Sequence, residues 1–85
     1  MAIKIESASG KGITGGTGGI PATMQKVEIV ADTEADITSL PAYREVVTDA
    51  DGIKVIPAKN SLAYTADLSV GYMLSPSGVW TKFRG

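Results

Sequence analysis

The chain is 85 residues long and has a formal net charge of -1 at pH 7. This length allows one small domain, and the near-zero charge argues against a nucleic-acid-binding protein, which normally carries a basic stripe. Cysteine and histidine are both absent, so the chain lacks disulfides, the commonest metal ligand and the usual general base at neutral pH. Because a domain this short is marginally stable alone, we expect association with other chains, and specifically a homo-oligomer.

The first residues, from Met1 to Lys4, lack the apolar stretch of a signal peptide. No later run approaches the roughly 20 apolar residues that are needed to span a bilayer. We therefore expect a soluble protein that is made in the cytoplasm and has no membrane partner.

The N-terminal part combines a short strand with a glycine-rich stretch. Residues 3–6 alternate apolar and polar side chains, as a half-buried strand does. Six of the ten glycines then fall within residues 10–19. Glycine loses more backbone entropy on ordering than any other residue, so this stretch is predicted to be an arm held by a neighbouring surface. The predicted attachment residues are Gly10, Gly12, Ile13, Gly15, Gly16, Gly18, Gly19 and Ile20. We accordingly divide the chain into an attachment segment, residues 1–24, and a β-rich domain, residues 25–85.

A second strand and a short helix are predicted next. Residues 26–31 are rich in β-branched side chains, with Val27 and Ile29 on one face. Residues 34–40 fit a helix that Pro41 ends after about two turns. The candidate N-caps are Asp32 and Thr33. The side chains that would face the domain are Ile37 and Leu40.

The remainder of the chain is predicted to consist of hairpins. The expected strands are residues 44–48, 53–56, 61–65, 71–75 and 79–83. Asp51-Gly52 ends a four-residue loop between the first two of them, which is a good hairpin signal. Pro57 is expected to interrupt pairing. The predicted class is mainly β: a small antiparallel hairpin and meander domain with one short helix and a Gly-rich N-terminal arm.

Two patterns resemble ligand sites but lack essential parts of them. Gly10-x-Gly12-x-x-Gly15 follows a strand, as a dinucleotide-binding fingerprint does, yet residues 15–21 cannot open the helix that the pyrophosphate needs. Asp49 and Asp51 resemble the start of a calcium loop, but the position of the bidentate Glu falls on Asn60. We interpret these segments as an arm and a turn, and predict neither a cofactor nor a metal.

Two groups of carboxylates could in principle supply acid–base pairs. They are Asp32, Glu34 and Asp36, and then Glu45, Asp49 and Asp51. The first group suits a helix N-terminus and the second a hairpin loop, and nothing in the sequence supplies the pKa tuning that catalysis requires. We therefore predict no catalytic residues and a protein that is not an enzyme.

Four aromatic residues gather in the C-terminal part: Tyr64, Tyr72, Trp80 and Phe83. Aromatic side chains dominate the burial available to a small domain, so packing in the core is the favoured interpretation. The alternative is a binding surface for a carbohydrate or receptor, formed by Tyr64, Tyr72 and Trp80.

The sequence also resembles small structural proteins of tailed phages. Residues 61–67 (SLAYTAD), 71–75 (GYMLS) and 77–80 (SGVW) are similar to a meander pattern of such proteins, and residues 30–41 (VADTEADITSLP) to the segment preceding it. The likeness covers residues 27–83. It departs from the pattern before Ser61, where Asn60 stands in place of a glycine, and it transfers no functional residue.

This resemblance implies a non-enzymatic virion protein, either a capsid decoration protein or a head-fibre subunit, synthesised in the host cytoplasm and attached through its arm. The implied partners are other virion proteins, with the major capsid protein as one candidate, and no nucleic acid. Two alternatives remain open. One is a tail or fibre-tip module that contacts a host glycan, and the other is a cellular accessory or interaction domain unrelated to viruses.

Overall fold

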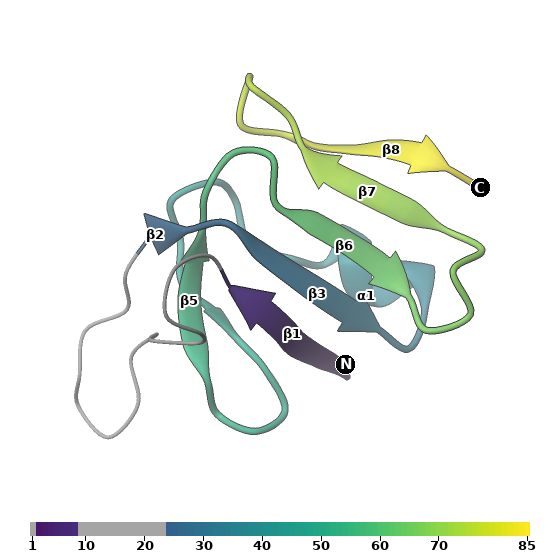
Figure 1. Ribbon diagram of the computed structural model, residues 1–85, viewed down its shortest axis with the longest axis horizontal. Helices are drawn as coiled ribbons and strands as arrows, with labels where there is room; N and C mark the ends of the chain where they lie inside the picture. Colours follow the sequence, from purple (N-terminus) through teal and green to yellow (C-terminus); the bar gives the residue numbers. More distant parts are fainter. Residues whose placement is uncertain (1, 9–23) are drawn as a thin grey trace.

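The computed structural model describes residues 2–8 and 24–85, and the predicted attachment residues, Gly10 to Ile20, lie outside this part of the chain. Eight strands and one helix are formed by the described residues (Figure 1). They are β1 (Ile3–Ala8), β2 (Met24–Gln25), β3 (Val27–Ala31), α1 (Glu34–Thr38), β4 (Val47–Thr48), β5 (Lys54–Pro57), β6 (Leu62–Thr65), β7 (Gly71–Leu74) and β8 (Trp80–Arg84). The predicted class, mainly β with one short helix, is confirmed.

The strands form a five-stranded sheet in the order β1-β3-β6-β7-β8 and a three-stranded sheet in the order β2-β5-β4. The hairpins β4–β5, β6–β7 and β7–β8 are antiparallel, as the turn signals predict. Two pairings are parallel, however: β3 with β6, and β2 with β5. A parallel pair needs a long crossover, and here α1, β4 and β5 lie between β3 and β6 in the chain.

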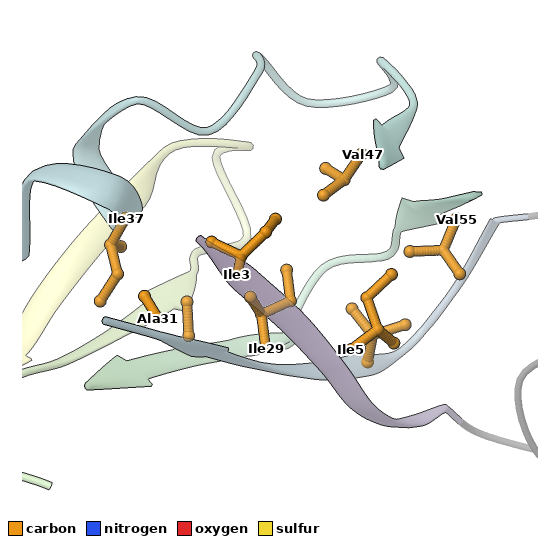
Figure 2. Close-up of a cluster of buried hydrophobic side chains, with 9 residues drawn as sticks. Ile3, Ile5, Ile29, Ala31, Ile37, Val47 and Val55 are labelled. Atoms are coloured by element: carbon orange, nitrogen blue, oxygen red, sulfur yellow. The ribbon is translucent and has the colours of Figure 1, made fainter. Parts of the chain in front are cut away.

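The core lies between the five-stranded sheet, α1 and the β4–β5 hairpin. Figure 2 shows Ile3, Ile5 and Ile29 beneath Val47 and Val55, with Ile37 of α1 at one end. Each of these side chains is at least nine-tenths buried. Burying such an aliphatic side chain contributes about 1.5–3 kcal/mol relative to exposure, so this cluster is the main source of stability.

Strand β1, which lies within the predicted attachment segment of residues 1–24, is an edge strand of the larger sheet. β1 pairs antiparallel with β3, opposing Ile5 to Ile29, and it contributes Ile3 and Ile5 to the core. The glycine-rich stretch, residues 10–19, lies outside the described residues. It connects β1 to β2, and both of these strands belong to the fold.

Helix α1 begins and ends for local reasons. Thr33 is its N-cap: its side chain accepts from the Asp36 N–H, and the Asp36 carboxylate accepts from the Thr33 N–H, which completes a capping box. The helix ends at Thr38, two residues before the predicted end. The hydroxyl groups of Thr38 and Ser39 both donate to the Ala35 carbonyl, so they compete for an acceptor of the last turn.

Two strand predictions need correction. Residues 44–46 are not part of β4, since Arg44 has a φ of 79°, which lies in the left-handed region and is incompatible with a strand. Pro57 does not interrupt pairing: it is the last residue of β5 and lies opposite Gln25 of β2. A proline is tolerated there because a strand end does not require its missing N–H.

The loop between β4 and β5 closes the outer edge of β1. The buried carboxylate of Asp49 accepts from the Ile5 N–H through Oδ2 at 3.1 Å, and from the Asp51 and Ile53 N–H groups through Oδ1 at 2.9 Å each. The Ala50 N–H donates to the Ile3 carbonyl at 3.0 Å. This loop therefore supplies hydrogen-bond partners to the edge groups of β1, the Ile5 N–H and the Ile3 carbonyl, and it joins the five-stranded sheet to the β4–β5 hairpin.

We expect Asp49→Asn to destabilise the protein by about 1–3 kcal/mol, because the amide NH₂ cannot accept from the buried Ile5 N–H. Urea unfolding at neutral pH measures this loss. Asp51→Asn is the matched control, since Asp51 is exposed and lies in the same loop. Equal stability of the two variants would contradict the role assigned to Asp49.

The turn between β6 and β7 depends on another carboxylate. Asp67 Oδ1 accepts from the Thr65 hydroxyl at 2.7 Å, the Ser69 hydroxyl at 2.8 Å and the Ser69 N–H at 3.0 Å. These hydrogen bonds, that of the Thr65 hydroxyl first, lower the pKa of Asp67 from 3.8 to about 2. The folded protein therefore favours the ionised carboxylate more than the unfolded chain does.

The depressed pKa of Asp67 predicts an acid-dependent loss of stability. This contribution is complete above pH 3.8 and is lost as the pH falls toward about 2. Thermal unfolding midpoints of wild type and Asp67→Asn should therefore differ at pH 5 and converge toward pH 2. A gap that persists unchanged at the low pH would contradict this assignment.

Candidate functional site

A groove with aromatic walls lies between the segment that follows α1 and the β7–β8 hairpin. Its volume is about 330 Å³, near the lower end of the range for small-ligand sites. It is lined by Ile37, Thr38, Leu40, Pro41, Ala42, Tyr43, Tyr72, Gly78, Val79 and Trp80. The aromatic groove, as we call this set, thus brings together Tyr72 and Trp80, two of the three residues predicted as a binding surface.

Tyr43 is the aromatic residue of this groove that sequence reasoning missed. Its ring packs on Gly78, where an added Cβ would lie 3.1 Å from the Tyr43 Cδ2 atom. Gly78 also has a φ of 84°, so both its backbone and its contact with Tyr43 favour glycine. The cations of Lys59 and Arg44 lie 5.5 and 5.7 Å from the Tyr43 ring centre, close enough for cation–π attraction.

Polar groups at the other side of the groove form a hydrogen-bonded set. The Tyr72 hydroxyl donates to Glu34 Oε2 at 2.7 Å, and Lys82 Nζ lies 2.8 Å from the same oxygen. The hydrogen bonds from Lys82 and Tyr72 lower the pKa of Glu34. The bond to Glu34 raises the pKa of both Tyr72 and Lys82. Glu34 and Lys82 are therefore held in their charged forms, and the Tyr72 hydroxyl remains a donor.

Tyr64 does not join Tyr72 and Trp80. In the register of β6 and β7, Ala63 lies opposite Tyr72 and Tyr64 lies opposite Gly71, so Tyr64 is on the other face of the sheet. Its hydroxyl donates to Glu28 Oε1 at 3.2 Å. Burial and then the neighbouring Glu28 carboxylate raise the pKa of Tyr64. The predicted three-residue surface is therefore split between two faces of the sheet.

The packing interpretation holds for some of the aromatic residues and fails for Phe83. Tyr72 and Trp80 are partly buried and pack against the core. Phe83 is 59% exposed, and its ring covers Gly71, where an added Cβ would lie 2.8 Å from the Phe83 Cζ atom. The register shift between Gly71 and Tyr72 makes Phe83 an extra residue of β8, which places its ring over Gly71.

Several acidic side chains in the described part of the chain accept hydrogen bonds that stabilise local structure. No group of three or more His, Cys, Asp or Glu residues there is arranged to hold a metal ion. Two of the carboxylates considered as acid–base candidates have backbone partners: Asp36 in the capping box and Asp49 at the edge of β1. Within the same residues, every buried side-chain nitrogen or oxygen atom has a hydrogen-bond partner. In the described part of the chain, no helix is long and apolar enough to cross a membrane.

Comparisons with protein-family models, curated protein sequences and solved structures found no match for this chain.

Proposed function

We propose that this chain is a structural subunit of a tailed-phage particle, either a capsid decoration protein or part of a head fibre. The observation that carries the proposal is a sheet face that no described element covers, on which apolar side chains lie beside Glu28. In a subunit that acts by assembly, such a face is available for a neighbouring protein. The similarity of residues 27–83 to phage structural proteins, described above, supplies the virion context.

The uncovered face can be traced through the strand registers. Val30 lies opposite Tyr64, Tyr64 opposite Gly71 and Leu62 opposite Met73, so these residues share one face of the five-stranded sheet. Their neighbours Ile29 and Ala63 point to the opposite face and are completely buried in the core. In Figure 1, α1 lies behind β3 and β6 and no described element lies in front of them. We call the face with Val30, Leu62, Tyr64, Met73 and Phe83 the outer face.

The proposed attachment segment is the glycine-rich stretch, residues 10–19, which would bind a neighbouring protein. Because β1 and β2 hold both of its ends, the stretch would contact a neighbour as a tethered loop. Glycine permits close backbone approach, which suits an extended segment lying along another protein's sheet. The proposed neighbours are other virion proteins, including the major capsid protein, and the proposed location is the virion.

Deletion of residues 10–19 tests this proposal, because it keeps Ile3 and Ile5 of β1 in the core. Phage particles are purified from cells that produce either the wild-type chain or the variant, and both are measured by mass spectrometry of the particles. We expect wild type in the particles, and a folded variant that is at least tenfold depleted. Leu68→Ser, an exposed change in the β6–β7 turn, is the control. Absence of the wild-type chain from the particles would contradict the virion proposal, and undiminished incorporation of the variant would contradict attachment by this segment.

The aromatic groove favours a second candidate function, recognition of a host glycan by a tail or fibre-tip module. Sugar rings stack on aromatic side chains, and Tyr43, Tyr72 and Trp80 offer three of them beside the charged Glu34 and Lys82. The groove supports this candidate with a different residue set from the predicted one, since Tyr43 replaces Tyr64.

The sole tryptophan of the chain, Trp80, reports directly on occupation of the groove. If a glycan binds there, titration with host surface oligosaccharides should shift the tryptophan emission saturably, and Tyr43→Ala should weaken binding about tenfold or more. Phe83→Ala, outside the groove, should bind like wild type. Loss of binding in Phe83→Ala but not in Tyr43→Ala would contradict the assignment to the groove.

A further inference from the structure

We propose that two copies of this chain pair antiparallel along β8, centred on Thr81, so that their five-stranded sheets join into one continuous sheet. This inference rests on the proposed function as an assembly subunit, and it names one contact of that assembly. The occupant of the open edge is a second copy of the same chain.

β8 is the one long open edge among the described strands. The outer edge of β1 is closed, because Asp49 and Ala50 bond to Ile5 and Ile3. β2 and β4, at the margins of the three-stranded sheet, have two residues each, and very short edges resist pairing. β8 has five residues, and Figure 1 shows no element beyond it. Its outward backbone groups are therefore available to another strand.

The hydrogen-bond pattern of the β7–β8 hairpin identifies these groups. The Ser75 N–H donates to the Val79 carbonyl at 3.0 Å, so Ser75 and Val79 form a hydrogen-bonded pair. In an antiparallel ladder such pairs alternate with pairs whose backbone groups point away. The backbone of Thr81, opposite Met73, is thus directed toward β7. The N–H and C=O groups of Trp80 and Lys82 are directed toward the open edge.

Centring the two copies on Thr81 matches both backbone and side chains. Trp80 of each copy then lies opposite Lys82 of the other, so outward N–H and C=O groups meet in hydrogen-bonded pairs. Thr81 lies opposite its own equivalent, and threonine pairs of this kind stabilise sheets. Val79 lies opposite Phe83 of the second copy, and each is 59% exposed in the single chain. The pairing thus covers Val79 and Phe83, two of the most exposed apolar side chains, in both copies.

Charge favours this register over its neighbour. Pairing centred on Lys82 would place two ammonium groups directly opposite each other, which is destabilising. In the Thr81-centred register each Lys82 instead faces Trp80 of the second copy, where a cation is attracted to the indole ring.

The absence of cysteine from the chain allows a direct test by cross-linking. Residues facing each other in a non-hydrogen-bonded pair have Cα atoms about 4.5 Å apart, a separation that a disulfide can span. We expect Thr81→Cys to form a disulfide-linked dimer on mild oxidation, at least tenfold faster than Lys82→Cys. Faster cross-linking of Lys82→Cys would overturn the register, and equally slow cross-linking of both would overturn the pairing.

Charged substitutions at Thr81 provide a second test that does not depend on a covalent bond. Thr81 is exposed, so Thr81→Lys and Thr81→Glu should both fold. By sedimentation velocity, each alone should dimerise about fivefold more weakly than wild type because like charges face each other. Their equimolar mixture should recover dimer. Wild-type protein that stays monomeric at all concentrations, or variants that match it, would overturn the inference.

These outcomes are separate from those of the virion proposal. If the chain is present in particles but the Thr81 variants dimerise like wild type, the β8 pairing fails while the structural role stands. If dimers form as expected but the chain is absent from particles, the virion role fails while the pairing stands. Binding of an acidic β-strand peptide to β8 of a strictly monomeric protein would also overturn self-pairing, because it would assign the edge to another occupant.

Discussion

The architecture of this protein depends on one buried carboxylate. Asp49 accepts hydrogen bonds from backbone N–H groups of its own loop and from the N–H of Ile5 in β1. These bonds join the five-stranded sheet to the β4–β5 hairpin. With these elements joined, the isoleucine and valine side chains between them form a closed core. The same hydrogen bonds occupy the edge of β1. The fold therefore has one closed edge and one open edge in its larger sheet, and the open edge is β8.

The two faces of that sheet have different chemistry as a result. The inner face contacts α1 and the β4–β5 hairpin, and at the β7–β8 end it continues into the aromatic groove with Tyr72 and Trp80. The outer face has Val30, Tyr64 and Met73, and none of the described elements in Figure 1 lies over it. A strand alternates its side chains between faces, so residues close in sequence serve different surfaces. Val79 and Trp80 line the groove and also belong to the proposed β8 contact, so the two proposed surfaces share residues at that end of the sheet.

Local signals predicted the parts of this fold that depend on nearby residues. The capping residues of α1, the Asp-Gly turn before β5 and the β6–β7 hairpin are set within a few positions of each other, and the structure has them as expected. The parallel pairing of β3 with β6 was not predicted, because it depends on a crossover rather than on a turn. The contribution of Ile3 and Ile5 to the core was not predicted for a similar reason, because these side chains pack with residues that are distant in the sequence. The groove residue Tyr43 was missed because its contact with Gly78 joins segments far apart in the chain.

The central claim, that the closed β1 edge leaves β8 as the edge where copies meet, can be tested by amide hydrogen exchange measured residue by residue at low and high protein concentration. The account predicts that the N–H groups of Trp80 and Lys82 exchange rapidly in dilute solution and become protected as concentration rises. The Thr81 N–H, which is directed toward β7, should be protected at both concentrations. The Ile5 N–H, which donates a hydrogen bond to Asp49, should be protected at both concentrations as well. Concentration-independent exchange at Trp80 and Lys82, or rapid exchange at Ile5, would contradict it.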